Sequence, residues 1–342
     1  RGDNFIEGMM RFNTDLNTME FYNGNEWRQF TYISDIKSSP SSRGRAIFAA
    51  GSNSDSPDGT SHIEFVQISS QGDGIDFANL TRAAFQVGGA GSNTRGVFAG
   101  GDPGPSGSDV IDYITLASSG DAIDFGNLSA GGRCAGGASS QTRALFGGVN
   151  STNAIEYIQI QTLGNAVDFG DIANGQSGSK GYLTSSPTRF FYFSGANDVA
   201  NIEFGTIASL GNTTTFGDST SIARRKNFAS NTTRAIFAGG YSMISPSPAQ
   251  TTLKAMDFIT MASEGNAVVF GDLIVARSRI NMTGDERTCL MAGGHTTPQT
   301  YTSSIEFVNY SSLGNAQHFG DLAVTKSQGG ATSDSHGGLG GY

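Results

Sequence analysis

The sequence has few of the residues that mark metal, redox and disulfide-rich proteins. Its 342 residues include two cysteines, four histidines, one tryptophan and eight prolines. Cys134 and Cys289 lie at non-equivalent places, so we expect neither a disulfide framework nor a cysteine metal motif. The histidines are His62, His295, His318 and His336. They have no metal-ligand spacing, so we predict no metal site.

Charge is also scarce, and its distribution excludes two kinds of partner. Charged residues make up 15% of the chain, with a formal net charge of −9. No basic run or stripe of basic and aromatic residues is present, so we expect no nucleic-acid partner. No apolar stretch is long enough to span a bilayer, so we expect no membrane insertion.

Catalytic and cofactor motifs are missing from the chain as well. No Ser/His/Asp grouping has local support, and paired carboxylates occur only in repeated positions. The double glycines are not followed by the lysine and helix start of a phosphate loop. We therefore predict no catalytic residues, no cofactor and no enzymatic activity.

Glycine and phenylalanine are abundant instead, with 48 and 23 residues, and much of the chain repeats. One strand-like block begins with arginine and ends in small residues, and it recurs six times. The copies are Arg45–Gly51, Arg95–Gly101, Arg143–Val149, Arg189–Gly195, Arg234–Gly240 and Arg287–Gly294. Each is followed by an apolar–acid–aromatic alternation, such as Ile63-Glu64-Phe65, which is typical of a strand. A glycine-centred turn leading to a phenylalanine comes next.

The acid-bearing block recurs at intervals of about 48 residues, which is the size of one four-stranded propeller blade. The sequence therefore predicts an all-β protein with a six-bladed propeller over residues 37–342. The segment Lys326–Ser333 has the character of a first strand, so we expect it to complete the first blade and close the ring. The tail His336–Tyr342 looks like a degenerate seventh second strand, which leaves seven blades as an alternative.

The repeated residues are interpreted first as structural. We expect the arginine of each second strand to pair with the acid of a third strand, and the repeated phenylalanines to fill the core. A ring of charged ligands around the channel is the alternative. The double glycine allows positive φ or close backbone approach. This double glycine, with an aromatic in each of the next two strands, resembles the kelch repeat, although phenylalanine stands where kelch blades carry tryptophan. The resemblance implies the fold alone.

Residues 1–36 form a separate predicted module. Met10–Phe12 and Met19–Tyr22 are expected to be two strands, and Asn23-Gly24 is a strong hairpin turn. The run Gly8–Asn13, the run Met19–Gly24 and Trp27 together resemble a short β-module of bacteriophage tail fibres and other virion appendages. A hairpin this small cannot bury its own aromatics, so it needs a partner, which in such fibres is commonly the same module in a trimer. The predicted assembly residues are Met10, Phe12, Met19, Phe21, Tyr22 and Trp27.

The glycine-rich propeller phrases also resemble propellers encoded by phages of marine cyanobacteria. Together the resemblances imply a virion structural protein, located on a phage tail or other appendage and extracellular when mature. Its partners would be other virion proteins, copies of itself, and a glycan or protein of the host surface. Two alternatives stay open: a secreted or surface carbohydrate-binding propeller of a bacterium, and a tail-spike enzyme that degrades glycans.

Recognition is expected on the face that carries the loops between the second and third strands. These loops differ in length and composition from repeat to repeat, whereas the turns between the third and fourth strands are nearly uniform. We expect a receptor site centred on residues 241–255, with residues 295–304 beside it; drifting surface loops without a ligand are the alternative. The candidate receptor residues are Tyr241, Met243, Ser245, Gln250, His295, Gln299 and Tyr301.

Overall fold

The structure is a computed structural model and is described here for part of the chain. The described residues are 6, 8–14, 18–29, 44–102, 107–134, 136–149, 152–174, 182–193, 200–242, 251–297 and 300–339. The chain divides into two compact units, Arg1–Ser42 and Arg43–Tyr342. Each unit is described by itself. The predicted boundary at 36/37 falls outside the described residues.

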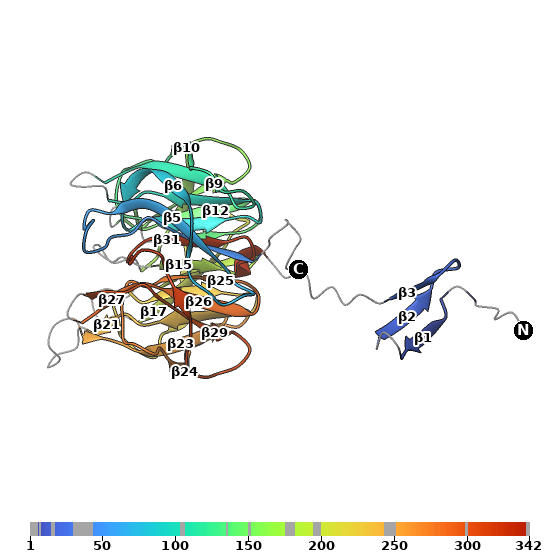
Figure 1. The fold of residues 1–342 in the computed structure, drawn as a ribbon. Helices are drawn as coiled ribbons and strands as arrows, with labels where there is room; N and C mark the ends of the chain where they lie inside the picture. Colours follow the sequence, from blue (N-terminus) through green and yellow to red (C-terminus); the bar gives the residue numbers. More distant parts are fainter. Residues whose placement is uncertain are drawn as a thin grey trace, which may run out of the picture. The chain divides into compact units, whose positions relative to one another are not determined.

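The first unit is a three-stranded antiparallel sheet of β1 (Met10–Asn13), β2 (Thr18–Tyr22) and β3 (Trp27–Gln29), in that order (Figure 1). The predicted hairpin of two strands is therefore one strand short. The Asn23-Gly24 turn joins β2 to a third strand, because the Asn23 side chain accepts the backbone N–H groups of Asn25 and Glu26, and Gly24 takes a φ of 93°. Trp27 begins that third strand.

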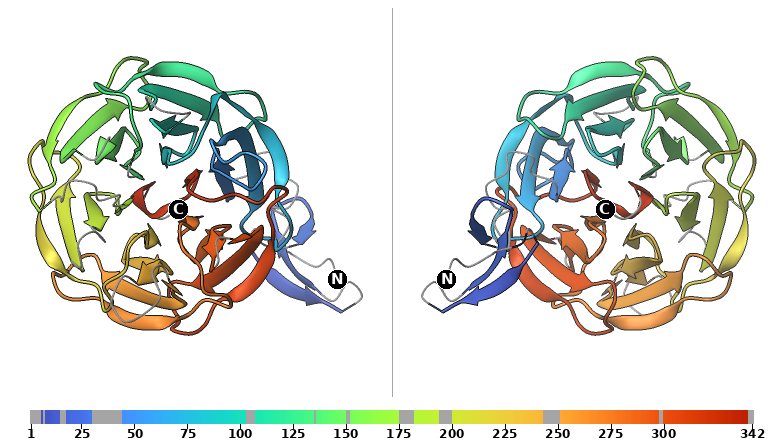
Figure 2. Two further views of the ribbon diagram at one scale, coloured as in Figure 1. Left: turned by 90° about the vertical axis from the view of Figure 1, so that its left-hand side faces the viewer. Right: turned by 90° about the vertical axis from the view of Figure 1, so that its right-hand side faces the viewer.

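The second unit is a ring of four-stranded antiparallel sheets, six of them among the described residues (Figure 2). We number the blades from the first along the chain. Blade 1 is β31 (Gly330–Ser333), β4 (Arg45–Ala49), β5 (Thr60–Gln67) and β6 (Ile75–Ala84). Blade 2 is β7 (Gly88–Gly91), β8 (Arg95–Ala99), β9 (Val110–Thr115) and β10 (Ile123–Asn127). Blade 3 is β11 (Gly136–Ser139), β12 (Arg143–Gly147), β13 (Ala154–Gln159) and β14 (Val167–Asp171).

The other blades follow the same order. Blade 4 is β15 (Tyr182–Ser185), β16 (Arg189–Phe193), β17 (Asn201–Thr206) and β18 (Thr214–Asp218). Blade 5 is β19 (Asn227–Ser230), β20 (Arg234–Ala238), β23 (Ala255–Thr260) and β24 (Val268–Asp272). Blade 6 is β25 (Asn281–Gly284), β26 (Thr288–Ala292), β29 (Ser304–Asn309) and β30 (Gln317–Asp321). Two small hairpins, β21 (Tyr241–Ser242) with β22 (Thr251–Thr252) and β27 (His295–Thr296) with β28 (Thr300–Tyr301), lie in the 2–3 loops of blades 5 and 6.

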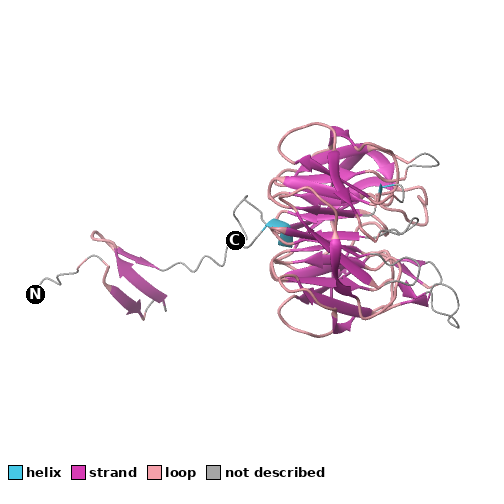
Figure 3. Cartoon of the chain, turned by 180° about the vertical axis from the view of Figure 1, so that it is seen from behind, coloured by secondary structure: helices cyan, strands magenta, loops and turns pink. Residues whose placement is uncertain are grey.

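Blade 1 closes the ring as predicted, because the C-terminal strand β31 pairs with β4 from Gly330 opposite Ala49 to Ser333 opposite Ala46. The alternative of a seventh blade is wrong. The described part of the tail contains no strand; it forms a 3-10 turn at Gly337–Leu339 (Figure 3). Six sheets have already closed the circle, so the tail has no neighbouring blade edge to join.

Aromatic side chains fill the layers between blades, as predicted for the repeated phenylalanines. The fourth-strand phenylalanines are at most 4% exposed. Each meets the third-strand aromatic of its own blade edge to face, with ring centroids 5.7–6.0 Å apart. The six pairs are Phe65–Phe77, Tyr113–Phe125, Tyr157–Phe169, Phe204–Phe216, Phe258–Phe270 and Phe307–Phe319.

The predicted pairing of second-strand arginines with third-strand acids is wrong. In blades 1 to 5 the arginine lies over the third-strand aromatic, at 4.7–5.1 Å from the ring centre. Its guanidinium then donates to a backbone carbonyl of the next blade; Arg234, for example, reaches the Tyr310 oxygen at 2.7 Å. The cation has an aromatic face and a carbonyl within reach, so it has no need of the acid.

The third-strand acids are nevertheless buried and structural. Each binds the connection that arrives from the preceding blade. Four have a cationic partner: Glu64 with Lys326, Asp112 with Arg82, Asp257 with Lys226, and Glu306 with Arg277. The other two, Glu156 and Glu203, accept backbone N–H groups from Ser129 and from Ala173 and Asn174. A buried carboxylate of this kind holds the chain where it crosses from one blade to the next.

The 3–4 turns join each blade to its neighbour. The Asn or Asp of every turn accepts the backbone N–H of a residue on the fourth strand of the preceding blade, at 2.9–3.0 Å in all six blades. In blade 3, Asn165 accepts from Asn127, and the Ala166 N–H donates to the Asn127 carbonyl at 2.8 Å. The outermost strands therefore have part of their free edge covered by the next blade.

The double glycine after the second strand has the role expected of it. Gly239 and Gly240 have φ of 65° and 94°, and a Cβ added to Gly239 would lie 2.2 Å from the Arg277 carbonyl oxygen. No residue with a side chain fits there without a shift of backbone, so glycine is required by both conformation and space.

We expect Asp257→Ala to be far more destabilising than Arg234→Ala. Removing Asp257 leaves the fully buried Lys226 ammonium without its partner, which costs about 3–5 kcal/mol of unfolding free energy. Arg234→Ala loses one ring contact and one charged hydrogen bond, about 1–2 kcal/mol in total. Urea midpoints measure both. Lys226→Met combined with Asp257→Leu should recover most of the lost stability. Equal losses for Asp257→Ala and Arg234→Ala would instead favour the original prediction that the arginine pairs with the acid.

Candidate functional site

The propeller has two unlike faces. The 2–3 loops and the 4–1 connections share one of them, which we call the loop face: the loop residues Ser52, Asp102, Tyr241 and His295 form backbone bridges with Ser327, Phe85, Arg224 and Ser278 of the connections. The 1–2 and 3–4 turns share the opposite face. The described propeller begins on that opposite face at Gly44, whose N–H donates to Asp334 in the turn after β31. The loop face is therefore remote from the point where the chain enters the ring.

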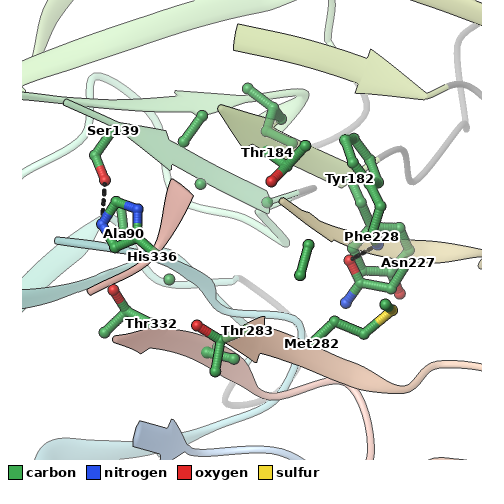
Figure 4. A pocket seen from close by; sticks show the side chains of 18 of the residues that line it. Ala90, Ser139, Tyr182, Thr184, Asn227, Phe228, Met282, Thr283, Thr332 and His336 are labelled. Atoms are coloured by element: carbon green, nitrogen blue, oxygen red, sulfur yellow. Dashed lines mark hydrogen bonds between the residues drawn. The ribbon is translucent and has the colours of Figure 1, made fainter. Parts of the chain in front are cut away.

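The six first strands surround a central channel that holds a cavity of about 80 Å³ (Figure 4). Since a water needs about 10–15 Å³ of such volume, this is room for a short row of waters and not for a sugar ring. The wall is polar and small: Ser139, Thr184, Thr283 and Thr332 extend into it from four blades.

The C-terminal tail closes one end of the channel. The His336 Nε2 donates to the Gly91 carbonyl at 2.8 Å, and Nδ1 accepts the Gly338 N–H at 3.2 Å. This pattern requires a neutral imidazole, and burial lowers the pKa of His336 to about 4. Gly338 passes so close to the wall that a Cβ there would meet the Ser139 carbonyl oxygen at 1.9 Å. Residues 336–339 therefore occupy this end of the channel.

A chain of backbone hydrogen bonds lines the other end, on the loop face. The residue two positions before a first strand has positive φ in four blades, between 56° and 61°, at Gln86, Arg225, Arg279 and Gln328. Their peptide groups connect in sequence around the ring: Gln86 donates to Gln328, Gln328 to Arg279, and Arg279 to Arg225. We call this ring of four residues the mouth. Because the four residues share one backbone conformation, their side chains start from nearly equivalent positions around the channel entrance.

Two of the mouth residues are arginines, held by polar neighbours. The Arg225 Nη1 donates to the Gln328 Oε1 at 2.6 Å, so its side chain extends across the entrance past the next blade. The Arg279 Nη1 donates to the Nδ1 of His295 at 3.1 Å. Burial and then the nearby arginines lower the pKa of His295 to about 4, so the ring is neutral and its Nε2 carries the proton.

Three tyrosines stand around the arginines. Tyr182, at the start of β15, shares a hydrogen bond with Arg225, and burial raises the pKa of its hydroxyl. Tyr241 begins the small hairpin beside Arg224. Tyr301 packs edge to face on His295, with ring centroids 4.2 Å apart. The loop face therefore combines cations and aromatic rings at the channel entrance.

The structure brings together three of the seven predicted receptor residues. Tyr241, His295 and Tyr301 all lie around the mouth, and His295 is only 4% exposed, so it supports Arg279 from beneath more than it presents itself. Met243, Ser245, Gln250 and Gln299 lie outside the described residues. The six predicted assembly residues divide between the faces of the small sheet: Met10, Phe12, Met19 and Phe21 share one face, while Tyr22 and Trp27 lie on the other, with Arg11 over the indole at 4.2 Å.

Sequence reasoning missed the two arginines at the centre of this arrangement. A signal was present. Arg225 and Arg279 occupy the same place before a first strand, and the other blades have no arginine there. In a chain of net negative charge, each also lies within two residues of another basic residue. Charged residues that break a repeat are better functional candidates than those that follow it.

Other kinds of site are not found in the described part of the chain. No cluster of three or more His, Cys, Asp or Glu side chains there is arranged to hold a metal ion. Nor do the described residues include a helix of the length and apolarity needed to cross a bilayer.

The buried His336 should make stability fall in acid. Its folded pKa of about 4 lies below the ordinary value near 6.5. The contribution of the neutral His336 to the free energy of unfolding is therefore complete above pH 6.5 and is lost as the pH falls from there through 4. We expect this residue to remove about 1–2 kcal/mol between pH 7 and pH 5. Urea midpoints at both pH values should show a smaller drop for His336→Gln than for the parent protein; an equal drop would mean that His336 does not cause the loss of stability in acid.

Compared with models of known protein families the chain matches none, and no curated protein is similar to it in sequence.

Proposed function

We propose that this protein is a virion structural protein of a bacteriophage, on a tail fibre or other appendage, which displays a propeller for recognition of the host surface. The observation that carries the proposal is that the chain has two unlike parts: a small sheet with the exposed apolar side chains Met10 and Phe12 precedes a propeller whose one variable face is built around half-buried polar and aromatic groups. The resemblance of the first thirty residues to tail-fibre modules supports the same assignment.

The first unit suits attachment. Met10, Phe12 and Met19 are 64%, 55% and 42% exposed, and they share one face of a sheet with only three strands. Burial of each such side chain against a partner is worth roughly 1.5–3 kcal/mol. The opposite face already has internal contacts, since Arg11 pairs with Glu20 at 2.8 Å and covers Trp27. The exposed side chains Met10 and Phe12 on the apolar face suit contact with copies of the same module or with another virion protein.

The propeller suits display. The chain enters it at Gly44 on the face of the 1–2 and 3–4 turns, so an N-terminal attachment leaves the loop face uncovered. The described third-strand acids are all engaged in holding blade connections, and this supports a binding role over glycan cleavage. A tail-spike enzyme would need free carboxylates at the mouth.

The first test is the oligomeric state. We expect Met10→Ser combined with Phe12→Ser to convert an oligomer into a monomer, because the pair removes the largest exposed part of the apolar face. The matched control is Ile123→Ser with Val268→Ser, two propeller side chains that are 57% and 56% exposed. Light scattering should give the parent mass for the control. The same mass for both double variants would contradict the assembly role.

The second test locates the protein. Gold-labelled antibody against the propeller should bind an appendage of the phage particle in electron micrographs. Purified propeller should bind host cells and should release no oligosaccharide from their surface polysaccharide. Secretion by an uninfected bacterium, with no label on particles, would favour a bacterial carbohydrate-binding propeller instead.

A further inference from the structure

We infer that the mouth of the channel is a binding site for an acidic glycan, with Arg225 and Arg279 as the residues that receive its carboxylate or sulfate group. The inference rests on the proposed recognition function and specifies its ligand class. It depends on three features of the described residues: the charge of the mouth, the donors that have no acceptor there, and the aromatic rings around it.

The charge at the mouth is not compensated. Of the two mouth arginines, Arg225 donates to an amide oxygen and Arg279 to an imidazole nitrogen; neither has a carboxylate partner among the described residues. After burial, the charge of Arg225 is the main influence that lowers the pKa of Arg279, so the two cations oppose each other. Two neighbouring guanidinium groups in a chain of net charge −9 form a site at which a bound anion would relieve repulsion.

Two buried hydrogen-bond donors at the mouth have no partner, against one buried acceptor, the Gln86 Oε1. The Nε of Arg279 and the Nε2 of His295 are buried and have no hydrogen-bond partner in the structure. Because the Nδ1 of His295 accepts from Arg279, its Nε2 is a donor as well. Buried donors without acceptors are costly, and an oxyanion supplies acceptors of the kind that guanidinium groups bind best.

The contrast with another arginine of the same face supports this assignment. Arg133 also lies in a 4–1 connection, between blades 2 and 3, but its Nε pairs with the Asp102 carboxylate at 2.6 Å. It is 46% exposed and its charge is neutralised within the protein. The loop face therefore has both an arginine that is paired with a carboxylate and two neighbouring arginines that have no carboxylate partner among the described residues.

The aromatic rings favour a sugar over a small free anion. Tyr182, Tyr241 and Tyr301 all lie near enough to Arg279 to influence its pKa, and Tyr301 packs on His295, which accepts a hydrogen bond from Arg279. Tyrosine offers an apolar ring for the C–H face of a sugar and a hydroxyl for its polar edge. The cavity beneath, about 80 Å³, is too small for a sugar ring, so the ligand must lie across the entrance and not within the channel.

The test is direct binding by titration calorimetry to the whole chain at low salt. The probes are alginate oligosaccharides for the carboxylate, carrageenan oligosaccharides for the sulfate ester, dextran oligosaccharides as the neutral control, and a single-stranded oligonucleotide as a phosphate control. We expect an acidic oligosaccharide to bind and dextran not to bind. Alginate alone would identify a carboxylate, carrageenan alone a sulfate ester, and both together the shared oxyanion chemistry.

Variants separate the site from general charge effects. Arg279→Gln and Arg225→Gln should each weaken binding at least tenfold, and Arg133→Gln by less than twofold, although all three remove the same charge. The melting temperature of each variant without ligand is the folding control. Arg279→Gln should not lower the melting temperature, because the substitution removes a charge that repels Arg225. Equal loss with Arg133→Gln, equal binding of dextran, or tighter binding of the oligonucleotide would overturn the inference.

The same variants distinguish this site from the host-recognition proposal. If acidic oligosaccharides bind through Arg225 and Arg279 but the parent propeller does not bind host cells, the glycan site stands and the host-recognition function fails. If the propeller binds host cells while no acidic oligosaccharide binds, recognition stands and the present inference is wrong.

Discussion

The contact on which the ring depends is the one between the 3–4 turn of a blade and the outer strand of the blade before it. A four-stranded sheet has a free edge, and six such sheets would offer six edges to other chains. Here the side chain of Asn165 and the backbone of Ala166 take up the polar groups of Asn127, and equivalent residues do so in every blade. This requirement explains why the turns are uniform, because a change in one blade would expose the edge of another.

The buried acids add the second connection between blades; every blade has an aspartate or a glutamate at this position, but its partners vary. Glu64 pairs with a lysine near the end of the chain, and Asp112 pairs with an arginine of the preceding outer strand. Glu203 accepts hydrogen bonds from uncharged donors of the backbone and of side chains. A carboxylate accepts several hydrogen bonds from different directions, so the same functional group can hold connections of different sequence. The pairing of Glu64 with Lys326 also brings together two residues far apart in sequence, in the blade that closes the ring.

The repeat made the architecture predictable, including six blades, closure by the C-terminal strand and the buried phenylalanines. Periodic alternation and spacing report which positions face the core, and the closed ring follows from counting strands. Partners were less predictable. Spacing alone could not show that Arg234 prefers Phe258 and a carbonyl of the next blade over Asp257, because that choice depends on the distance between layers. The third strand of the first unit was missed because Trp27–Gln29 is too short to show alternation.

The candidate site was predictable as a face and not as a set of residues. Loop variability indicated the loop face, on which Tyr241 and Tyr301 lie, but the charge comes from two arginines of the 4–1 connections, which the comparison of loops did not include. At the position of Arg225 and Arg279 the backbone has positive φ in four blades; two of the four residues are these arginines, and the other two are Gln86 and Gln328. The scaffold thus holds a backbone conformation and leaves the side chain free to differ. A ring with one conserved geometry and changeable side chains around its entrance can alter its ligand without altering its fold, which is the property that recognition of a variable host surface requires.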